Sequence, residues 1–192
     1  MKLKYNAPTV LTFAFISAVV LILSETLLHG LREVWFMVPG KGSFNPRSTR
    51  CWVTLVTHMA GHADWTHLIN NFAFILLIGP ILEETYGSIS LFIMILITAL
   101  VTGALNIIFF KTSLMGASGV VFMMILLASF TNFNKGEIPL TFILVLVLYL
   151  GRELFNSFSS NNISEFAHIV GGFCGSLFGF LNPPNDRQRT AP

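Results

Sequence analysis

The sequence has few charged residues and few cysteines. Asp, Glu, Lys and Arg make up 10% of the 192 residues, whereas a typical soluble domain carries about 25%. Such a chain cannot cover itself with a water-facing surface, and a formal net charge of +2 gives no sign of a nucleic-acid partner. Cys51 and Cys174 form no CxxC pair, so neither a disulfide nor a thiol site is predicted.

Hydrophobic residues make up 54% of the chain, and its mean hydropathy is +0.73. They occur in long blocks, and a helix needs about 20 residues to cross a hydrocarbon core roughly 30 Å thick. Because a helix satisfies its own backbone hydrogen bonds in lipid, helices are the expected spanning elements. The sequence therefore predicts an all-α membrane protein with six transmembrane helices. The predicted spans are residues 8–28, 65–83, 88–110, 117–132, 138–156 and 164–181.

We interpret residues 1–192 as a single transmembrane domain. Lys2 and Lys4 precede the first hydrophobic block, but this block is too long for a typical signal peptide and has no convincing cleavage site, so we expect a retained span. An even number of spans puts both termini on one side of the membrane. Lysines and arginines are spread almost evenly between the two sets of loops, so charge does not decide the orientation.

Two segments lie outside the predicted spans. Residues 31–66 are long and mixed in composition, and we expect a structured first loop that lies partly in the membrane interface. Residues 182–192 form a polar tail. Pro183 and Pro184 in this tail prevent the last helix from continuing.

Four strongly polar side chains stand in or beside the predicted spans, where such residues usually face the bundle interior or a water-filled cavity. They are His67, Asn71, Ser118 and His168. His67 and Asn71 are four residues apart, so they share one face of the second span. This pair could take part in chemistry or simply hydrogen-bond to a neighbouring helix, and its spacing leaves both open.

Ser118 belongs to a GxSG motif, Gly116 to Gly119, at the start of the fourth span. A serine at a helix N-terminus lies beside unpaired backbone N–H groups and a dipole that favours an oxyanion. The small neighbours allow another backbone or a substrate to approach closely. A serine also commonly caps a helix, and glycines pack membrane helices, so this motif alone is weak evidence.

His168 lies on a glycine-rich face of the last predicted span. Gly171, Gly175 and Gly179 recur every four residues and form a small-residue face suited to tight helix packing. His168 comes seven residues before Gly175, about two turns, so it projects from nearly the same face. If this face meets the fourth span, Ser118 and His168 come within reach of each other.

These residue types suit acyl transfer. A serine hydroxyl needs a base to take its proton, and neutral imidazole does this near pH 7. We expect Ser118 to be the nucleophile and His168 the base, with Asn71 and His67 as side-chain donors for the oxyanion. Glu165 is better placed to favour the N-terminus of the last helix than to complete a triad, so a dyad is favoured.

At these positions the chain resembles the rhomboid family of intramembrane serine proteases. The matching segments, in the family's order, are His67–Asn71 (HxxxN), Glu83–Gly87 (ExxxG), Gly116–Gly119 (GxSG) and Ala167–Gly175 (AHxxGxxxG). The resemblance covers about residues 52–181 and implies a six-helix rhomboid-like bundle. It implies Ser118 as nucleophile, His168 as general base, and an oxyanion hole made by the Ser118 N–H, Asn71 and His67.

The resemblance also implies supporting positions around the dyad. These are Gly116, Gly119, Phe122, Gly171 and Gly175. Family members often have a tyrosine at the position of Phe122, so ring packing against His168 is expected here without the hydroxyl. Family members also often carry Trp-Arg in the first loop, whereas Trp52 is followed here by Val53.

The sequence therefore predicts an intramembrane serine endopeptidase that cleaves transmembrane segments without a metal or cofactor. Its expected partners are single-span membrane proteins and membrane lipid, with no nucleic acid. We expect a multi-pass protein of a bacterial plasma membrane with both termini cytoplasmic. The alternative is a non-catalytic rhomboid-like protein that binds transmembrane clients, although such relatives usually lose the serine or the histidine.

Two other interpretations are less favoured. A channel or transporter would more naturally show paired charges in its spans or inverted repeats, and neither is seen. His58, His62 and His67 could suggest a metal site, but Met59 follows His58 where an HExxH motif requires glutamate. We interpret His58 and His62 as a cluster in the interfacial loop, with a role that the sequence does not reveal.

Overall fold

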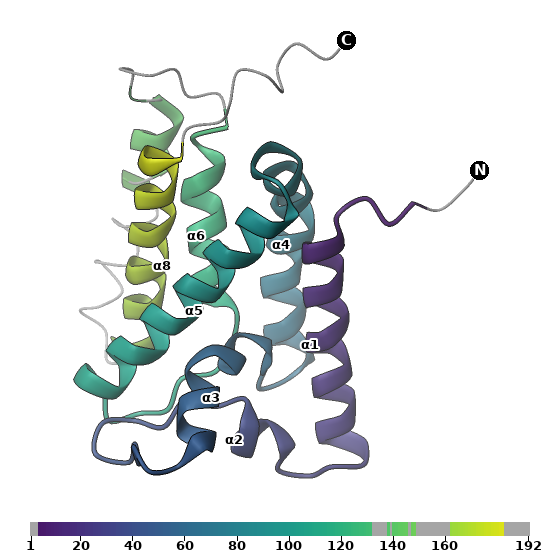
Figure 1. The fold of residues 1–192 in the computed structure, drawn as a ribbon, viewed down its shortest axis with the longest axis vertical. Helices are drawn as coiled ribbons and strands as arrows, with labels where there is room; N and C mark the ends of the chain where they lie inside the picture. The colour runs from purple at the N-terminus through teal and green to yellow at the C-terminus, as the bar shows by residue number, and fades with distance from the viewer. Residues whose placement is uncertain (1–3, 132–137, 139, 146, 149–161, 183–192) are drawn as a thin grey trace.

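All the long elements in the described part of the chain are helices (Figure 1). The computed structural model describes residues 4–131, 138, 140–145, 147–148 and 162–182. The elements are α1 (Pro8–Thr26), α2 (Leu31–Trp35), α3 (Thr49–Thr57), the 3-10 helix η1 (His58–Ala60), α4 (Trp65–Tyr86), α5 (Ser88–Phe109), α6 (Ser118–Ala128) and α8 (Asn162–Leu181). Extended pairing in these residues is limited to an isolated bridge between Val38 and Leu114. The predicted all-α class is confirmed.

Three helices, α1, α4 and α5, are long and apolar enough to cross a membrane. Helix α6 and residues 166–181 of α8 are shorter apolar helices. The fifth predicted span, 138–156, lies largely outside the described residues, although 140–145 are helical. Six spans were predicted, and the described residues support three by length and composition.

Several helix ends differ from the predicted boundaries, and two of these differences have clear local reasons. Helix α6 ends at Ala128 and not at 132, because the next amides turn back to the third preceding carbonyl, as in Ser129 N–H to Leu126 O. Helix α4 continues past 83 to Tyr86 and stops at Gly87. Gly87 has a φ of 83°, which glycine adopts at no steric cost.

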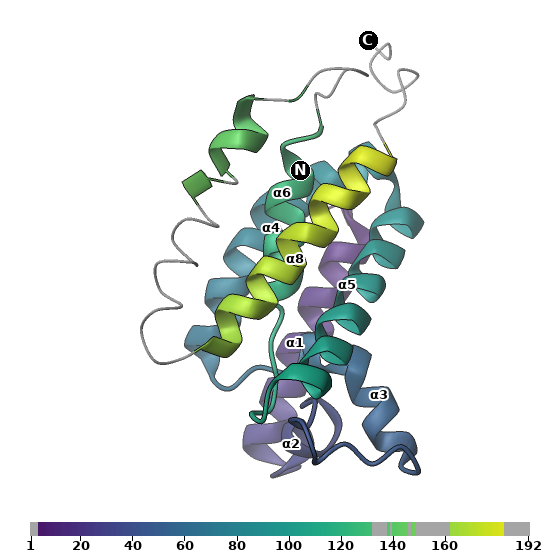
Figure 2. The same cartoon turned by 90° about the vertical axis from the view of Figure 1, so that its left-hand side faces the viewer.

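Helix α6 is the centre of the bundle, with α4 and α8 beside it (Figure 2). Residues 119–127 of α6 are all buried, which fits a helix that is apolar on every side. The outer helices instead leave large apolar side chains exposed, such as Leu77 of α4 and Ile89 of α5. Exposed apolar surface of this extent is typical of helices that face hydrocarbon.

Glu83 holds the start of α1 against the end of α4. Its Oε1 accepts a hydrogen bond from the Thr9 N–H at 2.8 Å, and its Oε2 accepts one from the Val10 N–H at 3.0 Å. The N-cap residue of α1, Ala7, has no side chain that can satisfy these first-turn amides. The carboxylate therefore acts as the N-cap of α1 from a helix more than 70 residues away, and its charge favours the positive end of the α1 dipole.

We expect Glu83→Gln to destabilise the fold by about 1–3 kcal/mol, because the charged acceptor of two first-turn amides, one partly buried and one buried, is lost. Thermal unfolding in detergent measures the change. Glu84→Gln is the matched control, because Glu84 is the neighbouring carboxylate and is exposed. Equal unfolding midpoints for the two variants would contradict the capping role.

Residues 31–66 form an ordered connection between α1 and α4. This connection contains α2, α3 and η1. Hydrogen bonds also hold it in place, such as the one that Arg32 Nη1 donates to Ala63 O at 2.6 Å. Trp35 and Trp52 are exposed, by 45% and 54%. Exposed tryptophans are common where a membrane protein meets the headgroup region.

Candidate active site

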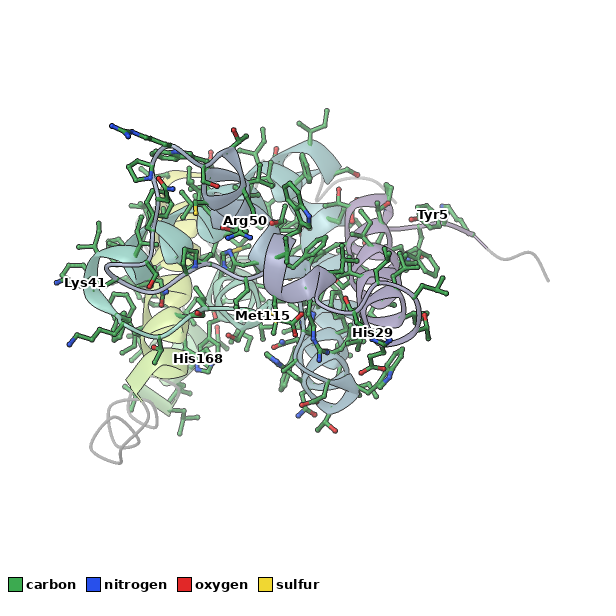
Figure 3. All side chains as sticks on the ribbon, turned by 90° about the horizontal axis from the view of Figure 1, so that it is seen from below. Tyr5, His29, Lys41, Arg50, Met115 and His168 are labelled. Carbon is green, nitrogen blue, oxygen red and sulfur yellow. The ribbon has the colours of Figure 1, made fainter. Side chains whose placement is uncertain are left out.

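The predicted site residues converge at one end of the bundle. Helices α4, α6 and α8 all begin at the end where α2 and α3 lie (Figures 1 and 2). Figure 3 looks onto this end and labels Met115, which precedes the GxSG motif, and His168. Three helix N-termini therefore point their positive dipole ends at the same region, which favours a developing negative charge there.

Glycines set the distance between α6 and α8. A Cβ added at Gly171 would overlap the carbonyl group of Gly119, and one added at Gly175 would overlap that of Met123. A Cβ added at Gly119 would lie 3.3 Å from Ala167 O. The backbone beside Ser118 therefore meets the backbone beside His168, as tight glycine-mediated packing requires.

His168 stacks on Phe122. The two ring centroids are 4.2 Å apart and the planes differ by 8°, a parallel stack. Phe122 is one helical turn after Ser118, so both residues project from the same face of α6. Ser118 is the first residue of α6, and both Ser118 and His168 are half-buried. The histidine ring is thus held on the face of α6 that begins with the serine.

His67 and Asn71 approach the GxSG turn from α4. A Cβ added at Gly116 would lie 2.7 Å from both Cε1 and Nε2 of His67, and 3.8 Å from Nδ2 of Asn71. Gly116 also has a φ of 123°, so a larger residue would be strained and would displace the imidazole. The buried Nδ2 of Asn71 has no hydrogen-bond partner among the described residues. The amide is a donor that faces the turn and is available for an acceptor there.

Asp64 fixes the start of α4. Its Oδ1 accepts a hydrogen bond from the His67 N–H at 2.7 Å, which makes Asp64 the N-cap. His67 is therefore in the first turn of α4, beside the site, and Asn71 follows one turn later on the same face.

His58 and His62 are buried inside the protein, whereas we interpreted them from the sequence as a cluster in the interfacial loop. Their exposed fractions are 2% and 0%. The backbone carbonyl of His58 accepts a hydrogen bond from the Gly116 N–H at 3.0 Å. The His58 ring lies 3.3 Å from Thr54 O through Nδ1 and 3.4 Å from Thr102 Oγ1 through Nε2. His58 therefore lies directly behind the turn that carries Ser118.

Burial lowers the pKa of both loop histidines from 6.5 to about 4, and the nearby His67 adds to the effect at His62. Both rings are therefore neutral at pH 7. No group of three His, Cys, Asp or Glu side chains arranged to hold a metal ion is found within the described ranges.

Acidification should therefore destabilise the protein. Protons bind the unfolded histidines near pH 6.5 but the folded ones only near pH 4. The stabilisation is complete above pH 6.5 and is lost as the pH falls towards 4, by up to about 3 kcal/mol for each histidine. Thermal unfolding in detergent between pH 4 and 8 measures it. His58→Gln should show a shallower decline than wild type, and identical declines would contradict this origin.

Comparison with known proteins decides the family. The Rhomboid domain family matches residues 49–184, about 70% of the chain. The chain belongs to the rhomboid family. The resemblance seen in its motifs is confirmed, and its apolar helices are those of an integral membrane protein.

Three related proteins show how distant the similarity is. Rhomboid protease GlpG of Haemophilus influenzae is 22% identical over 130 residues, which cover 66% of this rhomboid chain and 68% of the relative. RHOMBOID-like protein 7 of Arabidopsis thaliana is 29% identical over 135 residues, 66% of this chain and 42% of the relative. Rhomboid-like protein 11, chloroplastic, of Arabidopsis thaliana is 22% identical over 168 residues, 79% of this chain and 60% of the relative.

Proposed function

We propose that this rhomboid-family protein is an intramembrane serine endopeptidase that cleaves transmembrane segments of single-span membrane proteins. The observation that carries the proposal is the Phe122–His168 stack at 4.2 Å, which holds the imidazole on the face of α6 that starts with Ser118. A relative named as a rhomboid protease supports the same reaction class.

In the proposed reaction, His168 takes the proton of Ser118 as the hydroxyl oxygen attacks the carbonyl carbon of the scissile peptide bond. The negative charge moves to the carbonyl oxygen, which accepts hydrogen bonds from the Ser118 N–H, Asn71 Nδ2 and His67. His168 then donates its proton to the leaving amine, and an acyl-enzyme remains. Water, activated by the same imidazole, hydrolyses the acyl-enzyme and restores Ser118. No step requires a metal or cofactor.

The topology that we propose has six spans. Helices α6 and α8 and residues 138–156 join the three long spans, with both termini on the cytoplasmic side of a bacterial plasma membrane. Single-span substrates with glycine or proline near the cleavage site should be preferred, because these residues weaken a helix and expose the scissile carbonyl.

The test uses the purified protein in detergent with a single-span test substrate and a fluorophosphonate serine probe. The protease proposal expects cleavage of the substrate and covalent labelling that peptide mapping assigns to Ser118. If a folded sample shows no cleavage and no labelling, the protease proposal is overturned. That result would favour the alternative, a rhomboid-like protein that binds transmembrane clients.

A further inference from the structure

His62 belongs to the first loop, residues 31–66, and its ring packs against the side chain of His67. Its ring is fully buried, with its centroid 5.0 Å from that of His67 and the planes inclined by 70°. On another side the His62 ring packs at 5.7 Å against Phe72 of α4. The edge-to-face contact between the imidazoles of His62 and His67 favours one orientation of each ring.

His67 is in turn pressed against the serine turn. Its Cε1 and Nε2 atoms lie 2.7 Å from the position that a Cβ on Gly116 would take. The backbone N–H of His67 is bonded to Asp64, but its imidazole has no hydrogen bond among the described residues. The position of the imidazole is therefore set by packing, with His62 on one side and Gly116 on the other.

The backbone of His62 is itself held in place. Arg32 Nη1 donates to Ala63 O at 2.6 Å and lies 3.5 Å from His62 O. Glu25 Oε1 lies 4.0 Å from Arg32 Nη1. Its other carboxylate oxygen accepts a hydrogen bond from Trp65 Nε1 at 2.9 Å. The end of α1 and the starts of α2 and α4 thus fix the segment that carries His62. Because burial keeps the His62 ring neutral at pH 7, it places no charge beside His67.

We propose that His62 is a positioning residue, which holds the imidazole of His67 against the Gly116–Ser118 turn so that it can donate to the oxyanion. The inference rests on the proposed protease function and adds a residue that does not touch the substrate. A ring that supports one oxyanion donor acts on kcat and not on substrate binding, since the donor is needed only when charge develops.

The experiment is a double-mutant cycle on cleavage of a single-span test substrate, with His62→Ala, His67→Ala and the double variant. His62→Ala should lower kcat by about tenfold to a hundredfold and change KM by less than about threefold. In the His67→Ala background the same substitution should lower kcat by less than about twofold, because its effect passes through His67. His62→Phe, which keeps a flat ring, should retain kcat within about threefold.

Two controls separate positioning from folding. His29→Ala replaces an exposed histidine and should leave kcat unchanged. Thermal unfolding checks that each variant is folded, and His62→Leu, which has no flat ring, replaces His62→Ala in the cycle if that variant does not fold. Equal losses of kcat in both backgrounds, or a His62→Phe variant as slow as His62→Ala, would overturn the positioning role while the protease function stands. A folded wild-type protein with no turnover would overturn both.

Discussion

Ser118→Ala will abolish cleavage of a single-span substrate, with kcat lowered by at least about 10⁴-fold. This variant lacks the hydroxyl that forms the acyl-enzyme in the proposed reaction, on the face of α6 where the Phe122 and His168 rings stack. His168→Ala should cost about as much, because removal of the base leaves the serine protonated and weakly nucleophilic. The double variant should be no slower than either single one, since the two residues act as a unit.

Cleavage rates from a fluorogenic single-span substrate in detergent test this prediction. Ser129→Ala is the matched control, because Ser129 follows the same helix and lies eleven residues from Ser118. It should cleave at the wild-type rate. Thermal unfolding midpoints of Ser118→Ala close to wild type would show that the loss is chemical. A Ser118→Ala protein that still cleaves would point to a different nucleophile.

The local features of the site follow from the sequence because short-range rules determine them. Ser118 begins α6 because two glycines and a small residue precede an apolar run, and a helix starts there. The four-residue spacing of His67 and Asn71 puts them on one face of α4 whatever the tertiary contacts. Likewise the glycine repeat of the last span predicts close packing, and Gly171 and Gly175 lie against the backbone of α6.

The loop histidines could not be placed in this way, because their burial depends on contacts that are far apart in the sequence. His58 O pairs with the Gly116 N–H across more than 50 residues. Between the two histidines, a Cβ on Gly61 would lie 2.5 Å from Phe36 O and 2.9 Å from Met115 Cγ. Neither contact has a periodic signature, so a stretch rich in histidine and glycine looks like an exposed loop.

The stabilising contacts of Glu83 could not be predicted from the sequence either. Its ExxxG motif marks the end of α4, where Gly87 makes the turn into α5. The partners of its carboxylate, the amides of Thr9 and Val10, belong to the first helix. No spacing rule connects a carboxylate to amides more than 70 residues away, so this cap becomes visible only in the fold.

We expect Gly171→Ala to reduce the stability of the fold more than any other single added methyl group in this region. The new Cβ would overlap the backbone carbonyl of Gly119, and a backbone group cannot move aside as a flexible side chain can. Helix α8 would have to shift away from α6, which destabilises the fold by about 3 kcal/mol or more. Because α8 carries His168, the shift also separates the proposed base from Ser118, and activity should fall by about a hundredfold or more.

The adjacent glycine supplies the control. A Cβ added at Gly172 would meet Leu126 side-chain atoms at 3.6–3.7 Å, an ordinary van der Waals distance. Alanine also forms helix better than glycine by about 1 kcal/mol. Gly172→Ala should therefore match or exceed the thermal stability of wild type and keep its cleavage rate. If both variants unfold at the wild-type temperature, the crossing of α6 and α8 does not depend on the backbone approach at Gly171. If Gly171→Ala alone is both unstable and inactive, the glycine contact is what brings the histidine to the serine.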